Sequence, residues 1–250
     1  NPAMTDIPDD FLLEGNKDLT GTLKVGPAVK TIGTSAFANT KLTHLDLSEA
    51  TSLVSIGDYA FLGATDLVGT LAIPSTVTTI GAWAFANTEL TGLDLSKATS
   101  LVEIGQRAFS ETKLEGILAV PNTVTTIGPG AFAYTNLAGL DLSKATSLVE
   151  IGHGAFSESN LAGLDLSTAT SLVEIGEGAF SETNLAGTLA VPNTVTTIGA
   201  WAFANTELTC LDLSKATSLV EIGESAFYAA TNLAGTLAVP NTVTKIGNEA

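Results

Sequence analysis

Apolar residues recur along this chain with one fixed period, and their spacing predicts its architecture. An Ile-Gly pair occurs ten times at intervals of 23 or 24 residues, from Ile32 to Ile246. In nine of these repeats Ala-Phe follows at a constant offset, as in the segment from Ile80 to Phe85. A period near 24 that spans a whole sequence is typical of a solenoid, in which each coil stacks on the next. We therefore expect one elongated domain of about ten coils.

Within each coil, the alternation of apolar and polar residues predicts a short strand. In Leu45-Asp46-Leu47 the leucines are expected to point inward. A second apolar pair, such as Val77 and Ile80, should return along the opposite side, and glycine after Ile should allow a tight corner. The Ala-Phe segment predicts a short helical or 3₁₀ turn with Phe in the coil interior. We expect short parallel strands with 3₁₀ or irregular returns, and coils about 4.8 Å apart.

The coils have two forms. A Pro form reads Leu-x-Val-Pro-Asn-Thr-Val-Thr-Thr-Ile-Gly at 189–199, and an Asp form reads Leu-Asp-Leu-Ser-Lys-Ala-Thr-Ser-Leu-Val-Glu-Ile-Gly at 211–223. Their order is Pro, Asp, Pro, Asp, Pro, Asp, Asp, Pro, Asp, Pro. Residues 195–222 repeat residues 77–104 with one change, Cys210 standing where Gly92 does. Uniform columns can thus reflect a short history of duplication.

The combination of Leu-x-x-Leu-x-Leu with Val-x-x-Ile-Gly-x-x-Ala-Phe resembles the BspA-like leucine-rich repeats, the bacterial surface protein A type, over residues 19–250. The resemblance implies a leucine-rich repeat solenoid, a right-handed β/α superhelix with a parallel sheet on its concave face. It also implies surface-exposed or secreted proteins that bind host, matrix or neighbouring-cell molecules without known catalysis. Two features depart from the family: the Asp-form coil, and Thr, Ser or Ala where the family often has Cys three residues after Phe.

The two ends of the chain differ from the repeat between them. Residues 1–22, with Phe11 and Leu19, read as a degenerate N-terminal coil or cap, and residues 23–250 as the array. The last residue, Ala250, comes one position before an expected Phe. We therefore expect a fragment truncated at its C-terminus, with any export signal or anchor outside it, and possible end-to-end self-association.

Composition and charge narrow the classes of function. Ten basic against 26 acidic residues give a net charge of −16, a field that repels nucleic acid and anionic lipid. No apolar run is long enough to insert in a membrane. The lone thiol, Cys210, excludes an internal disulfide or a cysteine-based metal site. His44 and His153 lie in distant coils, and no serine or threonine has a nearby histidine as a base. We predict no enzyme, no cofactor and no metal site.

The two positions after each Ile-Gly form the most varied column of the repeat. This column holds both tryptophans, the only arginine, one of three tyrosines and one of two histidines, namely Trp83, Trp201, Arg107, Tyr59 and His153. Exposed Trp, Tyr and Arg are common anchors of interfaces, and ring faces also suit sugars. These five residues are our first candidates for ligand contact. The alternative is that the rings lie over Phe at the coil edge.

A second candidate is the aspartate column on the strands. Asp141 and Asp165 lie on adjacent coils, and we expect their Cβ atoms about 5 Å apart. Two such carboxylates should raise the pKa of one group or attract a cation. A weak Ca²⁺ site would lack ligands, since Ca²⁺ takes six to eight oxygens. The alternative is a solvated acidic stripe that keeps the array soluble.

The sequence favours a non-enzymatic binding or adhesion module for a protein or glycan ligand, located outside the cell or on its surface. The main alternative is a structural spacer, or stalk, of a larger surface protein. An ice-binding face is less favoured, because Val-Glu in intervening coils interrupts the Thr pairs such as Thr78-Thr79.

Overall fold

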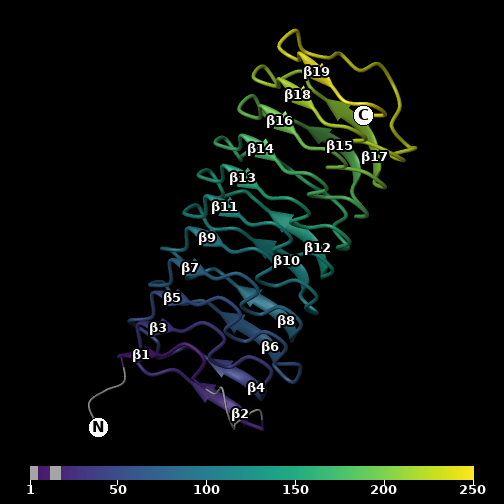
Figure 1. Cartoon of the computed structure of the whole chain (residues 1–250). Coiled ribbons are helices and arrows are strands. Elements are labelled where there is room, and N and C mark those ends of the chain that lie inside the picture. The colour runs from purple at the N-terminus through teal and green to yellow at the C-terminus, as the bar shows by residue number, and fades with distance from the viewer. Residues whose placement is uncertain (1–4, 12–17) are drawn as a thin grey trace.

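The computed structural model describes residues 5–11 and 18–250, and they form an elongated stack of coils with residues 5–11 and Ala250 toward opposite ends of the stack (Figure 1). No helix is found among these residues, and the segments around Ala-Phe are runs of consecutive turns. The returns are therefore irregular, and the expected helical or 3₁₀ turn is absent from this part of the chain. Of the predicted N-terminal coil, residues 1–4 and 12–17 lie outside the described residues.

One side of the stack carries a continuous parallel sheet built from the residue before each Ile and the Ile itself (Figure 1). Each isoleucine pairs with the isoleucine of the next coil, as Ile127 does with Ile151. The eleven strands, in spatial order, are β1 Asp6–Ile7, β3 Thr31–Ile32, β5 Ser55–Ile56, β7 Thr79–Ile80, β9 Glu103–Ile104, β11 Thr126–Ile127, β13 Glu150–Ile151, β14 Glu174–Ile175, β16 Thr197–Ile198, β18 Glu221–Ile222 and β19 Lys245–Ile246.

The opposite side carries longer strands of five or six residues that pair only two by two (Figure 1). The couples are β2 Thr20–Lys24 with β4 Lys41–Asp46, β6 Val68–Ala72 with β8 Glu89–Asp94, β10 Glu115–Ala119 with β12 Asn136–Asp141, and β15 Ala186–Ala190 with β17 Glu207–Asp212. In every couple a Pro-form coil pairs with the Asp-form coil that follows it. The strands are longer than the alternating triplet predicts, and they form four sheets where the family resemblance implies one.

Every couple contains a bulge at the same place. In the β10–β12 couple, Gly116 pairs with Leu137 and Ile117 pairs with Gly139, so Ala138 has no partner. Gly116 takes a φ of +76° at this shift of register, a conformation that glycine adopts without a steric penalty. The second of two consecutive Asp-form coils, residues 160–165, has no preceding Pro-form coil and forms no strand.

The core is a stack of parallel phenylalanine rings, one per coil. Neighbouring ring centroids lie 5.1–5.5 Å apart, with interplanar angles of 3–14°. This separation is the geometry of offset stacking. The stacked rings are Phe37, Phe61, Phe85, Phe109, Phe132, Phe156, Phe180, Phe203 and Phe227. Phe11 extends the contact at the N-terminal end, tilted by 59° against Phe37.

In most coils a buried hydroxyl donates a hydrogen bond to the backbone carbonyl of the stacked Phe. Thr135 Oγ1, for example, donates to the carbonyl of Phe132 at 2.9 Å. Six other coils repeat this bond, with Thr40, Thr88, Thr112, Ser159, Thr183 and Thr206 as donors. In the two coils with alanine at this position, the Ala64 and Ala230 amides donate to the Phe carbonyl instead. The position that often holds Cys in the family is thus a hydrogen-bonding position here.

Glycine after each isoleucine is required by close stacking. A Cβ on Gly152 would lie 2.7 Å from the backbone nitrogen of Pro129 in the preceding coil, and the other Ile-Gly glycines would meet backbone or side-chain atoms of the preceding coil at 2.2–2.8 Å. None of these glycines has a positive φ. The expected role in a tight corner is therefore wrong; glycine is needed here because a side chain would not fit between the coils.

Candidate binding surface

The second residue after each Ile-Gly occupies the left-handed region, with φ between +51° and +62°. The amide of this residue donates to the next coil, as Trp83 N–H does to the Gln106 carbonyl at 2.7 Å. The position forms a ladder along the turn edge of the stack, which we call the left-handed ladder. Its members are Ser35, Tyr59, Trp83, Arg107, Gly130, Gly154, Gly178, Trp201, Ser225 and Glu249.

Four of the five first-choice contact residues belong to this ladder, namely Tyr59, Trp83, Arg107 and Trp201. Tyr59 and Trp201 are exposed, whereas Trp83 and Arg107 are half-buried. His153 is exposed one position before the ladder, and its Nδ1 lies 3.7 Å from a carboxylate oxygen of Glu177. The structure therefore brings these five side chains to one edge, spread over several coils.

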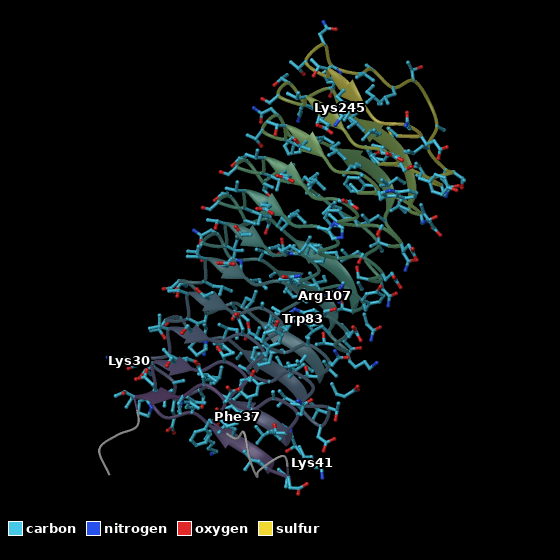
Figure 2. All side chains as sticks on the ribbon, in the orientation of Figure 1. Lys30, Phe37, Lys41, Trp83, Arg107 and Lys245 are labelled. Atoms are coloured by element: carbon cyan, nitrogen blue, oxygen red, sulfur yellow. The ribbon has the colours of Figure 1, made fainter. Side chains whose placement is uncertain are left out.

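The two tryptophans differ in their surroundings although their local sequences are nearly identical. The guanidinium carbon of Arg107 lies 4.7 Å from the centroid of the Trp83 ring, a cation–π contact whose two residues are labelled in Figure 2. Trp201 meets Tyr228 instead, with ring centroids 5.3 Å apart and planes tilted by 58°. Trp201 keeps 41% of its surface exposed. The difference arises from residues of the following coil.

Two exposed tyrosines near this edge lie outside both columns that the sequence predicts as candidates. Tyr134 and Tyr228 follow a Phe by two positions and one position, where other coils mostly carry small or polar residues. Their departure from the repeat was the available signal. A hydrogen bond with Glu158 and the charge of that carboxylate raise the pKa of Tyr134.

The aspartate column lies at the other edge of the coils, where the longer strands end. Each carboxylate accepts the amide N–H of the serine two residues on, as Asp141 does from Ser143 and Asp165 from Ser167 at 2.8 Å. Hydrogen bonds from these serines lower the pKa of both aspartates. The expected rise of one pKa is therefore wrong. Among the described residues, no group of three or more His, Cys, Asp or Glu side chains could hold a metal ion.

A groove of about 990 Å³ lies beside the first two couples. Its walls include the Asp-form loops at 48–51 and 96–99, and the shorter Pro-form loop at 74–76 lies between them. His44 and Asp46 contribute charge or polarity to a lining rich in threonine and serine. The longer Asp-form loops on both sides of a shorter one account for the groove.

Comparison with known proteins bears on the family and the fold. None of the curated proteins matches this chain. The structure is similar to YopM from Yersinia enterocolitica, with a TM-score of 0.60 and 16% identity over 92% of this chain and 44% of that one, so this chain spans less than half of YopM. It is also similar to a leucine rich cell surface protein from Faecalibacterium prausnitzii, with a TM-score of 0.50 and 20% identity over 93% and 78% of the two chains. At these identities the likeness concerns the fold.

The sequence itself matches a described family. Residues 30–162 and 149–250 match the BspA type leucine rich repeat region, in six copies. The described part of the chain contains no helix long and apolar enough to cross a membrane. The periodic Ile-Gly-x-x-Ala-Phe signature, the parallel solenoid and the matched segments agree, and the chain belongs to the BspA type leucine-rich repeat family.

Proposed function

We propose that this chain is a non-enzymatic recognition module that binds a protein or glycan through its solenoid surface, outside the cell or on the cell surface. The family and the similarity to a protein described as a leucine rich cell surface protein support this location. The contact residues are those of the turn edge, namely Tyr59, Trp83, Arg107, His153 and Trp201. Asp141 and Asp165, at the opposite edge, are bound to their own backbone and are secondary candidates.

The observation that carries the proposal is the presence of large side chains on the left-handed ladder. An L-residue in this conformation costs roughly 1–2 kcal/mol, and Gly130, Gly154 and Gly178 adopt it without that cost. Tyr59 and Trp201 stand at equivalent positions and leave 39% and 41% of their surfaces exposed, which is surface that a ligand can cover. Residues held in unfavourable conformations are concentrated at functional sites. Recognition explains why rings occupy positions where the fold favours glycine.

A spacer role is the second candidate, and the environment of Trp83 favours it. This ring is half-buried under Arg107, as a purely structural side chain would be. The unbroken Phe stack also needs no ligand to hold the coils in line.

The test compares binding after the rings are replaced by glycine, the residue that three other coils carry at this position. The biotinylated chain is applied to arrays of extracellular-matrix proteins and glycans, beside the double variant Tyr59→Gly with Trp201→Gly. Ser35→Gly is the matched control, since Ser35 shares the ladder and its φ is +52°. We expect the double variant to lose at least about tenfold in affinity, roughly the 1.4 kcal/mol of one modest interface anchor, and the control to bind like the parent. Equal binding by all three chains would remove these rings from the site, and a parent that binds nothing would favour the spacer.

A further inference from the structure

Trp201 forms one wall of a hollow of about 310 Å³ on the turn edge. The hollow is lined by His153, Gly154, Glu177, Gly178, Glu182 and Trp201, among others. Gly154 and Gly178 occupy the two ladder positions before Trp201 and carry no side chain there. The hollow thus lies where two consecutive ladder positions before Trp201 carry glycine.

The chain itself shows what the equivalent ring takes as a partner. Trp83 and Trp201 lie within the duplicated segments 77–104 and 195–222, which differ only at Gly92 and Cys210. The next coil places the Arg107 guanidinium over the Trp83 ring at 4.7 Å. At the position equivalent to Arg107 the second copy has Ser225, which is buried. Trp201 therefore lacks this cation; Tyr228 contacts its ring from the following coil, and the hollow lies on the side of the preceding coils.

The charge around Trp201 is suited to such a cation. Glu177 and Glu182 line the hollow and are both exposed. His153 is near Glu177, within 3.7 Å, and is the one basic side chain among the lining residues. The net charge of −16 gives the whole chain a field that attracts cations. An aromatic face beside carboxylates is the chemistry that recognises a guanidinium group.

We propose that the hollow beside Trp201 binds an arginine side chain of a basic segment in the partner. Trp201 supplies the ring face, Glu177 and Glu182 supply the negative charge, and Tyr228 supports the ring from the following coil at a centroid distance of 5.3 Å. The site deepens the proposed recognition function, on which it rests, by stating the chemistry of the ligand. A sugar on the same ring is the competing occupant.

Because the chain has only two tryptophans, their indole N–H signals in a proton–nitrogen NMR spectrum report on both copies at once. Trp83→Phe and Trp201→Phe assign the two signals. The probe is a capped pentapeptide of alternating glycine and arginine, compared with the same peptide carrying glutamate and with methyl glucoside. We expect the Trp201 signal to move saturably with the arginine peptide alone, and the Trp83 signal to stay in place. No movement of Trp201, or an equal response to methyl glucoside, would overturn the proposal.

Variants test each part of the site. With the backbone amides of Gly154 and Gly178 as reporters, Trp201→Gly should weaken peptide binding about two- to fivefold, the usual effect of an exposed cation–π contact. Glu177→Gln with Glu182→Gln should weaken it further, and Glu103→Gln, on the other face, should leave it unchanged. Arg107→Ala should let the Trp83 signal respond as well, and a silent Trp83 in that variant would contradict the claim that the ring takes a guanidinium.

The outcomes separate this site from the wider function. If the peptide fails to bind Trp201 while the arrays still retain the parent chain, the arginine site is wrong and the recognition function stands. If the peptide binds but no array surface retains the chain, the site exists and the ligand classes on the arrays are the wrong ones.

Discussion

The spacing between coils can be tested by adding one methyl group at Gly152. This glycine follows Ile151 near the middle of the array, and its φ lies outside the left-handed region. In Gly152→Ala the new Cβ would lie 2.7 Å from Pro129 N, 2.9 Å from the Gly128 carbonyl carbon and 3.0 Å from the Ile127 oxygen. All three are backbone atoms of the preceding coil, so no side-chain rotation can relieve the contact.

The expected loss of stability follows from how far the two coils must separate. The closest contact falls 0.7 Å short of the 3.4 Å at which ordinary van der Waals contact begins. Separating the coils by this amount would stretch the bond from Gly152 N–H to the Ile127 carbonyl, now 2.8 Å, beyond a normal hydrogen-bond length. Overpacking costs about 3 kcal/mol at the upper end of its usual range, and a weakened hydrogen bond adds about 1 kcal/mol. We therefore expect a loss of about 4 kcal/mol in the free energy of unfolding.

Two nearby glycines provide controls for this substitution. Gly154 has a φ of +58° and only Ser157 Oγ near its missing Cβ, at 3.5 Å, so Gly154→Ala should cost about 1 kcal/mol through backbone strain alone. Gly163 has nothing within 4 Å and no positive φ, so Gly163→Ala should stay within about 0.5 kcal/mol of the parent.

Urea unfolding followed by far-ultraviolet circular dichroism measures all three variants. Because repeat arrays can unfold in parts, the slope of free energy against urea must match the parent before the values are compared. Equal stability of Gly152→Ala and Gly163→Ala would refute the argument, since it would mean that the stack has room for a methyl group at every coil.

Three further outcomes follow from the core and the aspartate column. Phe156→Ala should lower the free energy of unfolding by about 3–5 kcal/mol in urea titration, because the ring is fully buried in the Phe stack; a loss below about 1 kcal/mol would show that the stack closes around the gap. Thr135→Val should cost about 1–3 kcal/mol by leaving the Phe132 carbonyl without its donor, whereas Thr135→Ser should retain most of the stability; equal values for the two would assign the effect to packing. Since the folded pKa of Asp141 lies below its usual value, its stabilising effect is present above about pH 4 and is lost as the pH falls through the folded pKa; Asp141→Asn should therefore make the melting temperature decline less between pH 5 and 2, and a decline as steep as that of the parent would contradict this.

The period of the sequence is sufficient to predict the solenoid and its aromatic core. Phe at a constant offset from Ile-Gly places one ring in every coil, and the structure stacks these rings face to face. The pairing of the longer strands was less accessible, because it depends on a shift of register between two coils at a glycine such as Gly116. The requirement for glycine at Gly152 likewise comes from an atom of the preceding coil, about 24 residues away in sequence.

The candidate site also depends on contacts between coils, which the sequence of a single coil does not predict. Varied residues after Ile-Gly drew attention to one column, and the structure gives the second residue of each pair a left-handed backbone, which glycine at three of the ten positions fits. Local sequence could not separate Trp83 from Trp201, since the difference lies in Arg107 and Tyr228 of the following coils. The pKa of Asp141 is lowered, against expectation, because Ser143 donates hydrogen bonds to its carboxylate.

The two sides of the stack differ in how their strands are hydrogen-bonded, so the molecule should resist bending differently in the two directions. One side is held by an unbroken eleven-strand sheet, while the other is divided into four couples. Bending that opens the divided side can separate one couple from the next without breaking a sheet. Bending in the opposite sense must break hydrogen bonds of the eleven-strand sheet. Under tension the array should therefore yield by couples, each releasing about 47 residues, or roughly 160 Å of extended chain. A stepped force–extension trace would show that each couple unfolds as an independent unit. The number of couples would then set the energy that the array can dissipate.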